Sequence, residues 1–157
     1  HRGAMVTIVE RVSKFTVSTQ IGDKSAATVT AATIALLEPY RDVVLTITAD
    51  NGKEFAYHEQ VTEALGAPVY FADPYSSSAI ASCIALSPAS MQSWQRGLNE
   101  NTNGLLRQYW PKKTDFKRVA AKDVAVVLEK LNNRPRKSLD YQTPAKIMQE
   151  HLLKVAA

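Results

Sequence analysis

The chain has 157 residues and a net charge of +4, a length that fits one ordinary domain. Hydrophobic residues make up 45% and charged residues 22%, which excludes a disordered polar chain. No stretch approaches the roughly 18 apolar residues of a membrane span, and the first residues carry no signal-peptide pattern. A single cysteine, Cys83, excludes a disulfide framework and a cysteine-rich zinc site. We therefore expect a single domain in a reducing, cytoplasmic setting, with no membrane partner.

The charge is distributed unevenly along the chain. Residues 1–93 hold 6 Lys/Arg and 9 Asp/Glu, a net charge of −3, whereas residues 94–157 hold 13 Lys/Arg and 6 Asp/Glu, a net charge of +7. A basic half joined to a mildly acidic half favours a polyanionic partner that is bound mainly by the second half. Lysine-rich helix surfaces without any such partner are the alternative.

The first half of the chain alternates predicted strands and helices. Short β-branched or alternating runs indicate a hairpin followed by two further strands. Helical spacing of apolar residues indicates two helices, the first capped by Asp23 or Ser25 and the second stopped by Gly66. The pattern predicts strands over residues 5–9, 15–21, 43–48 and 68–71 and helices over 26–37 and 57–65. This order is typical of an α/β layered domain.

The second half is predicted to be helical after one unusual segment. Residues 76–93 consist mostly of Ser and Ala, carry no charge and contain Pro88, which predicts a long loop with a weak helical turn near residues 80–86. Helical spacing of apolar residues returns after this segment. It predicts helices over residues 94–109, 121–131 and 143–153.

Asp50 is the most informative acidic residue. It follows an apolar strand directly, at the place where open α/β sheets bind ligands. The alternative is an Asp-Asn-Gly turn in which the side chains of Asp50 and Asn51 bond their own backbone.

Glu100 is the second candidate. It lies in a predicted helix that also carries Arg107, seven residues later and therefore on the same face. A carboxylate beside an arginine suits a metal ion next to a phosphate. A favourable interaction of Glu100 with the helix dipole is the alternative.

Two basic segments can bind a nucleic-acid backbone. Lys112 and Lys113 follow Trp110, a pairing of cations and aromatic rings that suits phosphate contact or base stacking, although Trp110 is equally suited to a core. Arg134, Arg136 and Lys137 surround Pro135 in a stiffened linker that can follow phosphates. The alternative for this linker is a solvated connection between two helices.

Four motifs together resemble the catalytic core of a bacterial insertion-sequence transposase. They are Asp50-Asn-Gly52, Asp73-Pro-Tyr-Ser-Ser77, Trp94-Gln-Arg-Gly-Leu-Asn-Glu-Asn101 and Asn133-Arg-Pro-Arg-Lys137, and they cover nearly the whole chain in order. The class is the acidic-triad (DDE) transposases, which are related to retroviral integrases, and the most similar group is the IS-thirty family. The resemblance implies a ribonuclease-H-like fold, a mixed sheet flanked by helices, with a helical C-terminal part.

Carried over by residue, the resemblance assigns catalytic and metal-binding roles to Asp50 and Glu100. These match the second and third acids of the triad. Arg107 matches a basic position associated with binding the donor end, and we count Asn51 with Lys112, Lys113, Arg134, Arg136 and Lys137 among the expected DNA-binding residues.

The sequence departs from the family in two places. The family's leading Asp lies on its first strand, a few residues before the point matching His1, so we expect residues 1–157 to be an N-terminally truncated core. In addition, 49 residues separate Asp50 from Glu100, and removing residues 78–93 restores the family's shorter spacing. These residues therefore resemble an insertion into the loop before the Glu100 helix.

The chemistry that the resemblance implies is metal-dependent phosphoryl transfer on DNA. Carboxylates suit Mg²⁺ or Mn²⁺, and such ions activate a nucleophile and stabilise the leaving oxygen. The partners implied are transposon ends and target DNA, bound by a homo-oligomer. With one acid of the triad missing, we expect impaired strand transfer or none. A catalytically inactive DNA-binding or assembly fragment and a ribonuclease-H-like nuclease remain as alternatives.

Overall fold

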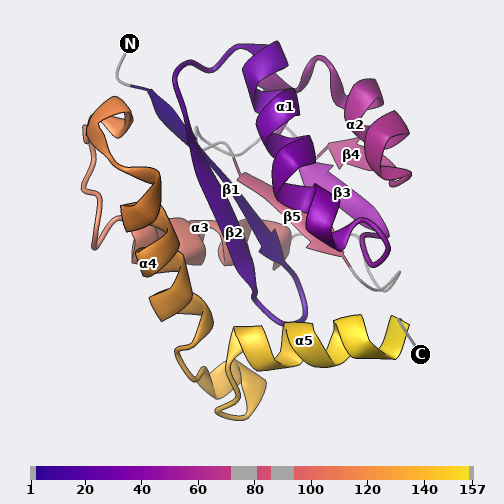
Figure 1. The fold of residues 1–157 in the computed structure, drawn as a ribbon, viewed down its shortest axis with the longest axis vertical. Coiled ribbons are helices and arrows are strands. Elements are labelled where there is room, and N and C mark those ends of the chain that lie inside the picture. Colours follow the sequence, from indigo (N-terminus) through magenta and orange to yellow (C-terminus); the bar gives the residue numbers. More distant parts are fainter. Residues whose placement is uncertain (1–2, 72–80, 86–93, 156–157) are drawn as a thin grey trace.

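The computed structural model describes residues 3–71, 81–85 and 94–155, and its centre is a five-stranded mixed sheet with strand order β2-β1-β5-β3-β4. Helices lie on both faces of this sheet (Figure 1). The expected mixed sheet with flanking helices is confirmed.

The predicted hairpin is confirmed. Strand β1 (Ala4–Glu10) pairs antiparallel with β2 (Thr16–Ile21). The carboxylate of Glu10, which is 1% exposed, accepts hydrogen bonds from the backbone N–H groups of Val12 and Ser13 and from the Ser13 hydroxyl. Glu10 therefore holds the turn between the two strands.

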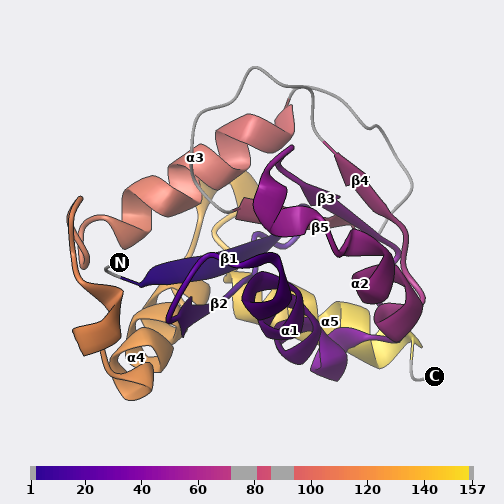
Figure 2. The ribbon, with the colours of Figure 1, turned by 90° about the horizontal axis from the view of Figure 1, so that it is seen from above.

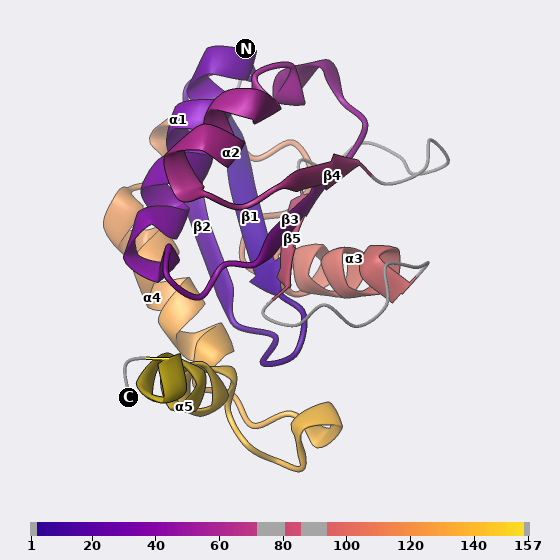
Figure 3. The same cartoon turned by 90° about the vertical axis from the view of Figure 1, so that its right-hand side faces the viewer.

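Helix α1 (Ala26–Leu37) begins where the sequence predicts, and Ser25 caps it by accepting a hydrogen bond from the N–H of Thr28. Its buried side chains, among them Val29 and Leu37, pack with Val6 and Ile8 of β1 in the main hydrophobic core. Helix α3 (Trp94–Leu106) lies across the opposite face of the sheet (Figures 2 and 3). The two faces of the sheet are thus covered by different helices.

Strand β3 (Thr46–Ala49) begins three residues later than predicted. The N–H groups of Val43 and Val44 both donate to the carbonyl of Tyr40, at 3.0 and 3.1 Å, so these buried residues close a turn instead of pairing in the sheet. Helix α2 (His58–Leu65) then ends at Gly66, whose φ of 68° suits glycine. The predicted strand over residues 68–71 is confirmed as β4 (Val69–Phe71), which pairs parallel with β3.

The prediction of a loop with a helical turn is wrong for residues 81–85. They form strand β5 (Ala81–Ala85), which pairs parallel with β1 on one side and antiparallel with β3 on the other. Without this strand, the backbone N–H and C=O groups of β1 and β3 that face it would lack hydrogen-bond partners. Forming these hydrogen bonds outweighs the low strand propensity of a Ser/Ala-rich segment. Residues 78–80 and 86–93 of the expected insertion, and the motif Asp73–Ser77, lie outside the described residues.

The helical C-terminal part is confirmed. Helix α3 ends three residues before the predicted position because Gln108 and Tyr109 donate to Leu105 and Leu106, which tightens the chain into a turn. Helices α4 (Ala121–Asn132) and α5 (Pro144–Val155) follow. A second core joins α3 to α4 and β1; its buried members are Leu106, Val127 and Leu131, with Met5, Leu105 and Trp110 packed against them.

Candidate active site and nucleic-acid interface

Asp50 lies immediately after β3, as the sequence predicts. Ala49, the last residue of the strand, is 1% exposed, whereas Asp50 is partly buried. The carbonyl of Asp50 accepts a hydrogen bond from the N–H of Gly52 at 2.8 Å. The short 3-10 helix that follows, Lys53–Phe55, buries Phe55 in the main core. This anchor fixes the turn that presents Asp50 at the carboxyl end of the strand.

Glu100 is exposed on α3, six residues after the helix begins. Thr102 and Leu106 are one helical turn apart and buried, and they form the face of α3 that packs on the sheet. Arg107, just beyond the end of the helix, is exposed like Glu100. The first turn of α3 contains no acidic residue. Because the dipole acts mainly within the first turn, it does not explain why an acid stands at position 100.

The described residues offer few ligands for a metal ion. They contain no group of three or more His, Cys, Asp or Glu side chains that could hold one. Glu10 is already occupied by three hydrogen-bond donors of its own turn. Asp50 and Glu100 therefore stand without a third acidic ligand among the residues described.

The first basic segment surrounds a cavity of about 370 Å³ at the C-terminal end of α3. Arg107, Lys112 and Lys113 line it, together with Trp110 and Phe116. Trp110 both packs against the second core and lines the cavity, so it combines the two roles that the sequence left open. Lys24, from the loop between β2 and α1, also lines the cavity. Sequence reasoning missed Lys24 because only the folded chain brings that loop next to residues 107–116.

The second basic segment lies at the other end of α4. Arg134 and Lys137 are exposed, whereas Arg136 is partly buried, and this burial together with the neighbouring charge of Arg134 lowers the pKa of its guanidinium. The backbone of Arg136 is held firmly, because its N–H donates to the Gln142 carbonyl and its own carbonyl accepts from Leu139 and Tyr141. The 3-10 helix Lys137–Leu139 lies within this turn and buries Leu139.

The two basic segments do not form one continuous patch. Helix α4 separates them, and its 12 residues span about 18 Å. Figure 1 shows the connection from α3 entering one end of α4 and the connection to α5 leaving the other. A bound nucleic acid would have to extend along α4 to contact both segments.

Comparisons with known proteins now indicate the family. Residues 2–77 match the integrase core domain. A transposase of insertion sequence IS4351 from Bacteroides fragilis is 42% identical over 144 residues, and the transposase InsI of insertion sequence IS30A from Escherichia coli K12 is 37% identical over 146 residues; each alignment covers 92% of this chain. The chain is similar to transposases of the IS-thirty family over most of its length. It spans 39% and 34% of the lengths of these two relatives.

The fold agrees with this family. The crystal structure of the catalytic core domain of BIV integrase matches with a TM-score of 0.63 and 19% identity, covering 99% of this chain and 97% of that one. The expected ribonuclease-H-like fold is therefore confirmed. Among the described residues, no helix is long and apolar enough to cross a membrane.

Proposed function

We propose that this chain is the catalytic core of a DNA transposase, acting by metal-dependent cleavage and strand transfer. The observation that carries the proposal is the 42% identity to a transposase over 92% of the chain, in a chain with the integrase-core fold. The partners would be transposon ends and target DNA, bound by a homo-oligomer at the bacterial nucleoid. The residues of the Ser/Ala-rich segment on either side of β5 would be additional to the family's core.

Asp50 and Glu100 are the residues that we assign to chemistry. Their carboxylate oxygens suit Mg²⁺ or Mn²⁺, which prefer hard ligands. The two side chains would hold such an ion, which would supply the charge needed to activate water or a 3′-hydroxyl and to stabilise the leaving oxygen. Asp50 would be supported by the fixed turn after β3, and Glu100 by the rigid helix α3. Because the described residues contain no group of three His, Cys, Asp or Glu side chains that could hold an ion, we expect weak metal binding and little or no strand transfer.

The basic side chains would position the DNA. Arg107 lies two helical turns from Glu100 and would hold a phosphate near the reacting one. Lys112 and Lys113 would extend this contact, while Arg134, Arg136 and Lys137 would bind the backbone beyond α4. Asn51, exposed beside Asp50, would contact the strand at the reacting end. Phosphate contacts of this kind fix register without reading sequence.

Metal binding tests the assignment of the two acids. Mn²⁺ at 100 times its dissociation constant should stabilise the chain by about 2.7 kcal/mol, which corresponds to about 5–10 °C in Tm for a domain of this size. Asp50→Asn and Glu100→Gln should each remove most of that shift. Asp42→Asn and Glu150→Gln, which neutralise other exposed acids, should leave it intact. A shift that persists in both active-site variants would contradict the assignment.

A catalytically inactive DNA-binding core is the second candidate. It is favoured by the lack of a third acidic ligand among the residues that the structure describes. If duplex DNA binds with the usual steep salt dependence but Mn²⁺ shifts the Tm of neither the wild type nor the variants, this reading replaces the first.

A further inference from the structure

The cavity at the end of α3 combines positive charge with aromatic walls. Lys24, Arg107 and Lys112 contribute cations from two separate parts of the chain, and no acidic residue is among those lining it. Its volume of about 370 Å³ falls within the range of small-molecule sites, which begins at roughly 300 Å³. The charge of this cavity favours an anionic ligand.

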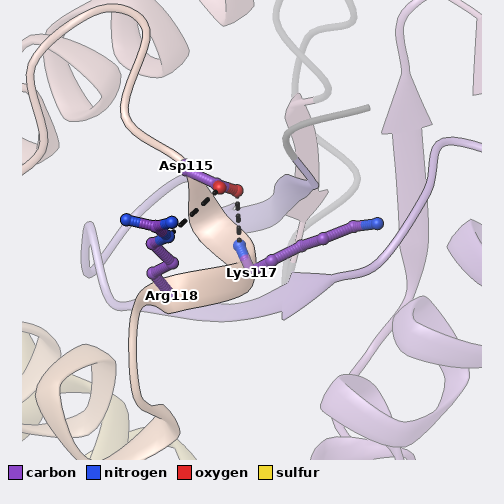
Figure 4. A network of polar contacts seen from close by, with 3 residues as sticks. All are labelled: Asp115, Lys117 and Arg118. Atoms are coloured by element: carbon purple, nitrogen blue, oxygen red, sulfur yellow. Dashed lines mark hydrogen bonds and ion pairs between the residues drawn. The ribbon is translucent and has the colours of Figure 1, made fainter.

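One acidic residue beside the cavity forms its contacts elsewhere. Asp115 lies between the lining residues Thr114 and Phe116, but its carboxylate forms an ion pair with Arg118 at 3.8 Å and accepts a hydrogen bond from the Lys117 N–H at 3.2 Å (Figure 4). The side chain of Lys117 extends away from that carboxylate in the same view. Asp115 therefore pairs with Arg118, which does not line the cavity.

The apolar wall of the cavity is aromatic. The rings of Trp110 and Phe116 meet edge-on, with centroids 6.4 Å apart and an interplanar angle of 63°. Leu106 and Met5 complete this wall. Leu106 is also a buried member of the second core, and Met5 packs against that core. An aromatic wall together with cations from two chain segments matches a ligand that has a flat ring and a phosphate, which is the chemistry of a nucleotide.

We propose that this cavity binds a single unpaired nucleotide of the DNA substrate. The base would contact Trp110 and Phe116, and the phosphate would contact Lys24 and Lys112. This inference rests on the proposed function, and it adds a site for an unstacked nucleotide to the backbone contacts proposed above. Arg107, which lines the cavity, is seven residues from Glu100, about 10 Å along α3. The nucleotide would therefore lie within a few positions of the reacting phosphate.

The experiment compares two duplexes of equal paired length, one blunt and one with three unpaired thymidines at a 3′ end. The wild type should bind the second at least about fivefold more tightly, since stacking one base contributes on the order of 1 kcal/mol or more. Lys24→Gln should remove most of this preference and reduce the salt slope of overhang binding by about 0.7, the value for one phosphate contact on a single strand. Trp110→Phe should retain part of the preference. Lys154→Gln, an exposed lysine near the end of α5 and outside the cavity, should change neither quantity.

A second arm uses thymidine 5′-monophosphate alone and measures binding by calorimetry. Weak binding of the mononucleotide that Lys24→Gln abolishes would support the site. This would hold even if the chain bound no duplex, because failure to bind duplex would count against the proposed function and not against the cavity. Equal affinity for blunt and overhanging duplexes would overturn the cavity proposal and leave the transposase assignment standing. A preference for the overhang that Lys24→Gln and Trp110→Phe leave unchanged would also overturn the cavity proposal. A chain that binds neither the duplexes nor the mononucleotide would overturn it as well.

Discussion

Asn132 on α4 and Thr16 on β2 form two hydrogen bonds with one another across 116 positions of sequence. The Asn132 side-chain amide donates to the Thr16 carbonyl at 2.8 Å, and its oxygen accepts from the Thr16 N–H at 2.9 Å. The amide thus offers the donor and acceptor that a neighbouring strand would offer. Strand β2 is an edge of the sheet, and open edges invite unwanted pairing. Because both proposed DNA-binding segments flank α4, this pair also fixes where they lie relative to the sheet.

Replacing Asn132 should therefore destabilise the fold. Asn132→Ala leaves a buried N–H and a buried carbonyl of Thr16 without partners, and each such group costs about 1–3 kcal/mol. We expect the free energy of unfolding in urea to fall by about 2–4 kcal/mol, the lower part of that combined range. Asn133→Ala removes the adjacent, exposed amide and should cost much less. Equal losses for the two variants would show that the contact with Thr16 contributes little.

Glu10 gives a prediction that separates structural acids from catalytic ones. Glu10→Gln keeps a carbonyl oxygen but loses one charged acceptor for the N–H groups of Val12 and Ser13, so the free energy of unfolding should fall by about 1–3 kcal/mol. The shift of Tm caused by Mn²⁺ should survive, because Glu10 serves its own turn. A Glu10→Gln protein of normal stability that no longer responds to Mn²⁺ would reverse this interpretation.

Local patterns in the sequence predicted most elements of the fold. Helix α1, with its cap at Ser25, and helix α2, with its stop at Gly66, follow from signals within a few residues of each end. Strand β5 could not be predicted in this way, because what makes it a strand is its position between two unpaired neighbours, far away in sequence. The cavity has the same origin: Lys24 and Trp110 belong to different segments, and no spacing rule connects them. Asp50 and Glu100 could be selected from the sequence because Asp50 directly follows a predicted strand and Glu100 shares a predicted helix face with Arg107.

Asp23 should make stability depend on pH in the acid range. Its carboxylate is hydrogen-bonded to the Ser25 hydroxyl and accepts from the Ser25 N–H at 2.7 Å, and these contacts, with a smaller contribution from Thr28 and the Lys117 charge, lower its pKa below the ordinary 3.8. A lowered folded pKa gives stability that is present above the unfolded pKa and lost as pH falls through the folded value. Between pH 6 and pH 2, the wild type should therefore lose more Tm than Asp23→Asn. Asp42→Asn, which removes another exposed carboxylate, provides the matched comparison; identical pH profiles for all three proteins would contradict the prediction.

Strand β5 gives the sharpest test of the fold. Cys83 pairs with Val9 of β1 and with Thr48 of β3, so it lies in the middle of the sheet. Proline at this position cannot donate to the ladder and is poorly tolerated in central strands, whereas it is compatible with a surface loop. Cys83→Pro should therefore lower the free energy of unfolding by about 3 kcal/mol or more, while Cys83→Ser keeps the backbone donor and separates the effect of losing the thiol. If Cys83→Pro melts at the wild-type temperature, residues 81–85 do not pair with β1 and β3 and form a loop, as the sequence pattern alone predicts.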